Sequence, residues 1–125
     1  MSNMTRLEQI VAELPEAVRV DVEAWDGHST FRVAGKTFMF ADVDATGITV
    51  KLDKQEAAAL VATDPAVEAA GYGLGRAGWV MVTLGRRPSA ARWREIAEWV
   101  RTSYALLAPK RLSRQAGDDR VRDGG

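Results

Sequence analysis

The chain has 125 residues, and its 17 basic and 17 acidic side chains give a formal net charge of zero. Hydrophobic residues make up 46% and charged residues 27%, a composition typical of one soluble globular domain. Cysteine is absent and His28 is the single histidine, which excludes disulfides, thiolate metal sites and sites with two imidazoles. Because no apolar run approaches the roughly 20 residues that span a bilayer and the start of the chain lacks a secretory pattern, we expect a cytoplasmic protein.

The charges are distributed unevenly along the chain. Residues 1–70 contain 6 basic and 12 acidic residues, whereas residues 71–125 contain 11 basic and 5 acidic ones. A local positive patch can therefore exist in a molecule of zero net charge. The alternative is that oppositely charged segments attract one another and cover different solvated faces.

The first elements are predicted to be a helix and a strand. Thr5 and Glu8 form a capping-box pattern, and apolar residues at helical spacing follow as far as Pro15, which ends the helix. From Val18 to Ala24, valine or alanine alternates with charged or aromatic residues, which predicts a strand with the valines on its buried side.

An antiparallel meander is expected next. Asp26-Gly27 is a turn signal, residues 30–33 and 37–43 have strand character, and Ala34-Gly35-Lys36 is a tight turn between them. A further strand with period two spans residues 48–52. The connections are too short for parallel crossovers.

The second half of the chain is predicted to alternate helix, strand and helix. Asp53 caps an alanine-rich helix that runs to Thr63, and Ser89 caps the longest helix, which ends near Ala108. Between them, residues 71–78 contain four glycines and precede a strand over residues 79–84. This order predicts an α+β fold in which helices pack on one face of an antiparallel sheet. We expect one domain over residues 1–112 and a flexible tail over residues 113–125, which has a single valine.

Two motifs suggest chemistry that their context does not support. Residues 73–78 match G-x-G-x-x-G, but a strand follows them where a dinucleotide site needs a helix. Asp26, His28 and Ser29 are the residue types of a hydrolytic triad, yet neighbours on one tight turn rarely converge on a substrate atom. Asp21, Glu23 and Asp26 are interpreted as a solvated strand face. We therefore expect no catalytic residues, no metal and no cofactor.

Two sets of residues are candidates for binding. Trp99 lies off the centre of the long helix's apolar stripe, so a partly exposed ring is expected to contact a protein partner. Basic residues at turns and element ends are candidates for phosphate contact. This second set comprises Arg32, Lys36, Arg76, Arg86, Arg87, Lys110 and Arg111.

Three segments together resemble the bacterial MmcQ/YjbR family: residues 27–38, residues 78–80, and Ser103-Tyr104 with residues 107–112. The resemblance covers roughly residues 7–112. It implies a helix, a three-strand meander, a helix, two strands and a helix, similar to the type III secretion chaperone fold. It also implies DNA binding by a double-wing arrangement, with Arg32, Lys36, Trp79, Lys110 and Arg111 at positions of the family pattern.

The expectation is therefore a small cytoplasmic module that binds DNA and has no catalytic activity. The alternative is a protein-interaction or small-ligand adaptor that uses the sheet and Trp99. A monomer is expected in either case. The acidic first half of the chain opposes DNA binding, so the hypothesis depends on whether the basic residues converge.

Overall fold

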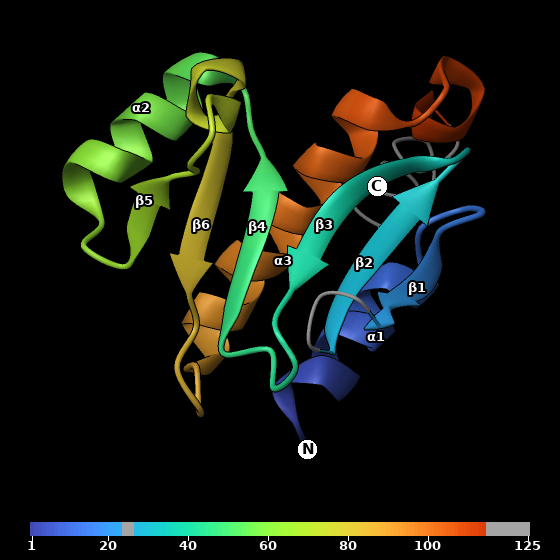
Figure 1. Cartoon of the computed structure of the whole chain (residues 1–125), viewed down its shortest axis with the longest axis horizontal. Coiled ribbons are helices and arrows are strands. Elements are labelled where there is room, and N and C mark those ends of the chain that lie inside the picture. Colours follow the sequence, from blue (N-terminus) through green and yellow to red (C-terminus); the bar gives the residue numbers. More distant parts are fainter. Residues whose placement is uncertain (24–26, 115–125) are drawn as a thin grey trace, which may run out of the picture.

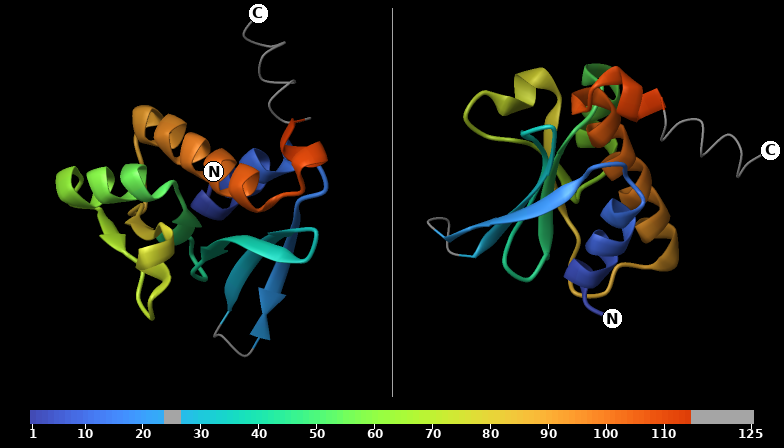
Figure 2. Two further views of the ribbon diagram at one scale, coloured as in Figure 1. Left: turned by 90° about the horizontal axis from the view of Figure 1, so that it is seen from above. Right: turned by 90° about the vertical axis from the view of Figure 1, so that its right-hand side faces the viewer.

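Six antiparallel strands form one sheet, and the helices lie on one side of it (Figures 1 and 2). The structure is a computed structural model that describes residues 1–23 and 27–114. The strand order is β1-β2-β3-β4-β6-β5, which confirms the predicted α+β fold. In chain order the elements are α1 (Asn3–Ala12), β1 (Val18–Val22), β2 (His28–Val33), β3 (Lys36–Ala41), β4 (Gly47–Lys51), α2 (Lys54–Thr63), β5 (Val67–Ala69), the 3-10 helix η2 (Leu74–Ala77), β6 (Trp79–Thr83) and α3 (Ala90–Leu107).

Helix α1 begins earlier than predicted. Its N-cap is Ser2, whose hydroxyl accepts a hydrogen bond from the Thr5 N–H at 3.1 Å, so the predicted cap at Thr5 is wrong. The buried Asn3 side chain donates to the carbonyls of Ala45 (2.9 Å) and Gly85 (2.7 Å), which fixes the first turn against two loops. Such distant partners give no local sequence signal.

Strand β1 has the predicted alternation, but its valines lie on the opposite face of the sheet from the one predicted. Its valines pair with Arg32, Thr30 and His28 on the side of the sheet that faces away from the helices, and Val18 is 54% exposed. Arg19 instead faces α1, where its guanidinium contacts Glu8 and Asp21. The predicted burial of Val18 is therefore wrong, because at this sheet edge the helix side presents a polar row. Ala24, the predicted end of the strand, lies outside the described residues.

A bulge interrupts the pairing of β2 with β3. Phe31 pairs with Met39 and Arg32 pairs with Thr37, which leaves Phe38 as the extra residue. As a result, the side chains of Phe38 and Met39 are both fully buried although they are consecutive. The ring of Phe38 packs edge to face against Tyr104 of α3, with centroids 5.6 Å apart.

The core lies between this bulged sheet and the long helix α3. The predicted cap at Ser89 is confirmed, since its hydroxyl accepts from the Arg92 N–H at 3.0 Å. The predicted apolar stripe is confirmed as well, because Trp93, Ile96, Val100 and Tyr104 are all buried. The capping of α2 by Asp53 is also observed.

Buried Ser103 of α3 joins two strands where they diverge. Its hydroxyl donates to the Phe38 carbonyl at the bulge and accepts from the Lys51 N–H at 2.9 Å. Strand β3 pairs with β4 only from Met39 to Ala41, so these two groups have no partner in the other strand. One side-chain hydroxyl therefore replaces the missing ladder bonds.

The glycine-rich segment forms a turn, as predicted, and not a nucleotide-binding loop. It contains η2 and ends at Gly78, whose φ is +99°. The Gly78 carbonyl accepts from the Leu52 N–H at 2.9 Å, and β6 follows immediately. A Cβ at Gly78 would lie 2.2 Å from the Leu52 carbonyl oxygen, so the close approach requires glycine.

The family resemblance implies two strands between the second and the last helix. These strands are β5 and β6, which pair antiparallel. After α3, residues 110–114 form a further helical turn in which Leu112 is buried and 1% exposed. Residues 115–125, most of the predicted tail, lie outside the described part of the chain. Within the described part, no helix has the length and apolarity needed to cross a bilayer.

Candidate nucleic-acid interface

One end of the sheet is defined by the turn between β2 and β3. At this end β2 ends, β3 begins, β4 ends and β6 begins (Figure 1). The C-terminal part of α3 reaches the same end, because Ser103 bonds to Phe38 and Lys51 and the Tyr104 hydroxyl donates to the Pro15 carbonyl at 2.7 Å. Five segments distant in the sequence therefore meet here.

Basic side chains outnumber acidic ones on these segments. The five segments are residues 15–18, 32–36, 51–56, 76–79 and 103–114, and three acidic residues lie on them, namely Glu16, Asp53 and Glu56. Eight basic residues, which we call the cationic end, are Arg32, Lys36, Lys51, Lys54, Arg76, Lys110, Arg111 and Arg114. The structure thus assembles at one end five of the seven basic residues singled out from the sequence.

Few of these charges have a carboxylate partner among the described residues. Arg111 pairs with Glu16 at 3.0 Å across an exposed surface. Arg32 lies on the outer face of the sheet, where its Nε donates to the Thr30 hydroxyl at 3.0 Å. In the described ranges, no carboxylate lies within ion-pair distance of Lys36 or Lys110. Both lysines are exposed, so their ammonium groups are available to an anionic partner.

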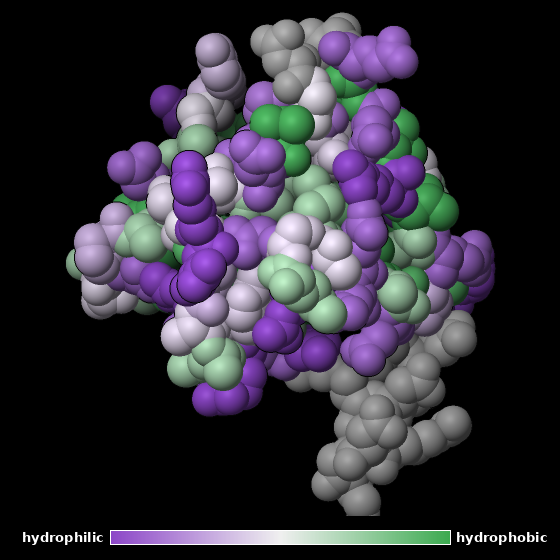
Figure 3. Space-filling model, turned by 90° about the horizontal axis from the view of Figure 1, so that it is seen from below, coloured by the Kyte–Doolittle hydropathy of each residue, from purple (hydrophilic) through white to green (hydrophobic). Residues whose placement is uncertain are grey.

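Arg86 and Arg87 do not belong to this group. They follow Gly85 at the other end of the sheet, where β6 ends and where Gly85 contacts Asn3. Seen from that end, hydrophilic residues cover much of the surface, with hydrophobic ones between them (Figure 3). Asp42 and Asp44 follow β3 at the same end, so this end also carries acidic residues. The structure therefore divides the predicted set into five residues and two.

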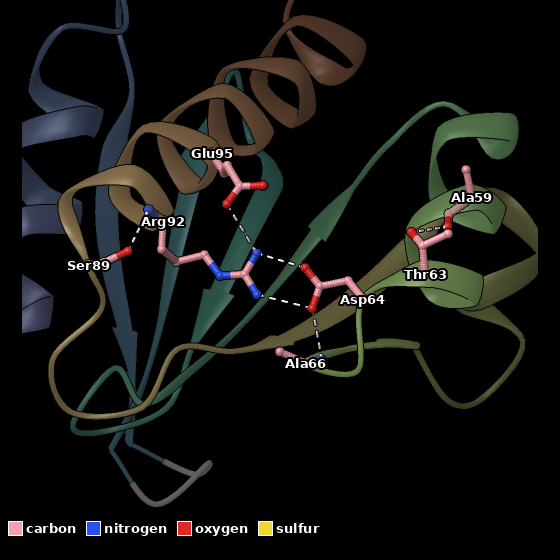
Figure 4. A network of polar contacts seen from close by, with 7 residues as sticks. All are labelled: Ala59, Thr63, Asp64, Ala66, Ser89, Arg92 and Glu95. Atoms are coloured by element: carbon pink, nitrogen blue, oxygen red, sulfur yellow. Dashed lines mark hydrogen bonds and ion pairs between the residues drawn. The ribbon is translucent and has the colours of Figure 1, made fainter.

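The predicted exposure of Trp99 is wrong. Its side chain is buried, with 6% exposed, and the guanidinium of Arg92 lies over its ring at 5.4 Å from the centroid. Arg92 is held by two bonds to the Asp64 carboxylate, at 2.7 and 3.0 Å, and by a longer one to Glu95 (Figure 4). The Ala66 N–H also donates to Asp64 at 3.0 Å. This network, which joins the α2–β5 turn to α3, covers the ring, so Trp99 is not available to a partner.

Asp64→Asn is expected to lower the free energy of unfolding by about 1–2 kcal/mol at pH 7, because it removes the charge from a paired, largely shielded site. Hydrogen bonding from Arg92 lowers the pKa of Asp64 below its ordinary value of 3.8. The carboxylate therefore stabilises the fold fully above pH 3.8, and this contribution is lost as the pH falls through the lower folded-state pKa.

Urea unfolding of the wild type and of Asp64→Asn between pH 7 and pH 2.5 measures this difference. The difference between the two curves should begin to shrink as the pH falls below about 3.8. The exposed Asp44→Asn is the control and should leave stability unchanged. A difference of constant size from pH 7 to pH 2.5 would contradict the assignment.

Of the residues considered for catalysis, Ser29 has a structural role. Ser29 is buried and donates to Asp21 at 2.9 Å, which occupies its hydroxyl in a structural bond. That bond and the contact with Arg19 lower the pKa of Asp21. Asp26 lies outside the described residues. Among the residues that are described, no three acidic or histidine side chains are grouped so that they could hold a metal ion.

The outer face of the sheet carries exposed apolar side chains that the sequence analysis did not single out. Met81 of β6 is 48% exposed and Val18 of β1 is 54% exposed. On the same face, Phe40 of β3 and Trp79 of β6 pack edge to face with centroids 5.9 Å apart. This face holds mainly apolar and threonine side chains at its centre, and Arg32 and Lys51 lie toward the cationic end.

Comparison with known proteins agrees with the fold and with the resemblance. The YjbR family matches residues 12–106. The chain belongs to the YjbR family. The YjbR domain is also similar to the crystal structure of the Deinococcus radiodurans protein DR2400, a DUF419 domain, with a TM-score of 0.69, 24% identity and coverage of 94% of this chain and 89% of that one. None of the functionally curated proteins matches the YjbR chain.

Three basic residues of the YjbR domain's cationic end were missed by reasoning from the sequence. Lys51 ends a strand, Lys54 begins a helix, and Arg114 lies in the turn after α3. None belongs to a motif. The predicted strand order could have indicated Lys51 and Lys54, because in an antiparallel sheet the end of one strand lies beside the start of the next.

Proposed function

We propose that this YjbR protein is a nucleic-acid-binding module that contacts the phosphate backbone with its cationic end and performs no catalysis. The observation that carries the proposal is the gathering of eight basic and three acidic residues on the segments that meet there. Within residues 1–23 and 27–114 the ammonium groups of Lys36 and Lys110 have no carboxylate partner. Such groups suit phosphate oxygens, because no carboxylate in those ranges competes for them.

Zero net charge determines how such binding behaves. At physiological salt, charges further away than about 8 Å are largely screened, so the acidic residues at the opposite end have little effect on a phosphate at the cationic end. At low salt they reduce the attraction. Binding is thus expected to depend on local contacts and to be sensitive to salt.

The test is a fluorescence-anisotropy titration of a labelled 20-base-pair duplex at 50 and 200 mM salt. For the wild type we expect measurable affinity at 50 mM that falls steeply at 200 mM. The double variant Lys36→Ala with Lys110→Ala should bind about tenfold more weakly and show a salt slope about two units smaller.

The matched control is Arg86→Ala with Arg87→Ala, which removes the same charge from the opposite end and should bind like the wild type. Absence of duplex binding by the wild type at 50 mM salt would overturn the proposal. An equal loss of affinity in both double variants would also overturn it, since that result would reflect overall charge alone.

The outer sheet face favours a second candidate function, that of a protein-interaction module. Val18 and Met81 are about half exposed and lie on the same face as the Phe40–Trp79 pair. Exposed apolar groups on one face are typical of association surfaces. If the duplex titration fails, a change of Met81→Glu that abolishes association measured by sedimentation would support this alternative.

A further inference from the structure

A groove separates helices α1 and α3 on the side of the molecule away from the outer sheet face. The two helices run side by side there (Figure 2). The groove has a volume of about 370 Å³ and is lined by residues from both helices, among them Arg6, Gln9 and Ile10 on α1 and Trp93, Arg94 and Ala97 on α3. Its volume is within the range of small-molecule sites, which is roughly 300–1,000 Å³.

The floor of the groove is apolar because of the helical spacing of its residues. Ala90, Trp93 and Ala97 lie at i, i+3 and i+7 on α3, so they share one face. The two alanines leave open a space that larger side chains would fill, and Ile10 lines the groove from α1. The space therefore suits a hydrocarbon or an aromatic ring.

The walls carry two arginines, Arg6 of α1 and Arg94 of α3, which differ from Arg92 and Arg101 of α3. On that helix, Arg92 pairs with Asp64 and Arg101 pairs with Glu98 at 2.8 Å. In the described part of the chain no carboxylate lies within 4.0 Å of Arg6 or Arg94. Both line the groove.

The guanidinium of Arg6 is positioned without losing its hydrogen-bond donors. It lies over the Trp93 ring, 5.7 Å from the centroid. A cation–π contact of this kind orients the group while its N–H donors stay available to an anion. Glu13, the C-cap residue of α1, also lines the groove, so the groove has both a positive and a negative side chain on the α1 side.

We propose that this groove binds a small amphipathic anion, in which an aromatic or aliphatic body carries one carboxylate, sulfonate or phosphate group. The anionic group lies between Arg6 and Arg94. The body packs on Ile10, Trp93 and Ala97, and Gln9 supplies a further donor. This site uses none of the residues of the cationic end, so it stands independently of nucleic-acid binding.

Two fluorescent probes of the same ring system test the proposal. 8-Anilinonaphthalene-1-sulfonate carries the anion, and N-phenyl-1-naphthylamine lacks it. The wild type should bind one sulfonate probe per chain, and Arg6→Gln or Arg94→Gln should each weaken this affinity about tenfold, the equivalent of one charge-assisted contact. Their affinity for the neutral probe should change less than about twofold.

Two further variants provide the controls: one fills the groove with a large side chain, and the other changes an arginine outside the groove. Ala97→Trp should abolish binding of both probes, whereas Arg101→Gln, which loses a paired arginine outside the groove, should leave both affinities unchanged. Circular dichroism melts of each variant establish that it is folded. The proposal is overturned if the folded wild type does not bind the sulfonate probe, if Arg6→Gln with Arg94→Gln binds it as the wild type does, or if Ala97→Trp retains it.

Discussion

Gly78→Ala is expected to lower the free energy of unfolding by about 3–5 kcal/mol, because two separate costs act at one position. The residue has a φ of +99°, which L-residues other than glycine rarely adopt. The added Cβ would also lie 2.2 Å from the Leu52 carbonyl oxygen, a backbone atom that cannot rotate away. Relief of this contact would break the Leu52–Gly78 hydrogen bond, which joins β4 to β6 beside the cationic end.

The matched control is Gly73→Ala, five residues earlier in the same glycine-rich segment. Gly73 also has a positive φ, +81°, but a Cβ on this residue would meet nothing within 4 Å in the described part of the chain. Only the conformational cost of about 1–2 kcal/mol should therefore appear. Urea denaturation of both variants measures the difference, and equal destabilisation would show that the contact with Leu52 is unimportant.

Ser103→Ala is expected to lower the free energy of unfolding by about 2–4 kcal/mol, since it leaves two buried backbone groups without a partner, at about 1–3 kcal/mol each. These groups are the Phe38 carbonyl and the Lys51 N–H. No other strand can supply the bonds, because β3 and β4 diverge at this point. The substitution removes one oxygen atom, so loss of packing contributes little.

Chemical denaturation and amide hydrogen exchange together check this expectation. The Lys51 amide should exchange faster in Ser103→Ala than in the wild type. Ser113→Ala removes a hydroxyl that bonds the Lys110 carbonyl at 3.2 Å on an exposed surface, and its effect should be below about 0.5 kcal/mol. A destabilisation of Ser103→Ala as small as that of Ser113→Ala would refute the bridging role.

Local signals account for the parts of the fold that were predicted. Asp53 and Ser89 cap helices through bonds to amides two or three residues away, so the sequence is sufficient to locate both. The stripe from Trp93 to Tyr104 follows from helical periodicity alone. Ser2 has the same capping chemistry as Thr5, and the choice between them was made by Asn3 and its distant partners.

The predictions of side-chain burial were wrong where burial depends on residues that are distant in the sequence but close in space. Alternation in β1 separates two faces but does not specify which one the helices cover, and Val18 proved to be on the open face. The ring of Trp99 is covered by Arg92, whose partner Asp64 lies 28 residues away. The cationic end depends in the same way on topology, which brings Lys36 near the segment that contains Lys110 only after the sheet has formed.

The placement of charge along the strands has a consequence for the approach of any partner. Basic groups collect where β3 begins, and Asp42 and Asp44 follow its other end. A neutral molecule with this arrangement has a permanent electric dipole. Near a highly charged polymer the field exerts a torque on this dipole, so the molecule rotates to present its positive end to an anionic polymer before contact is made.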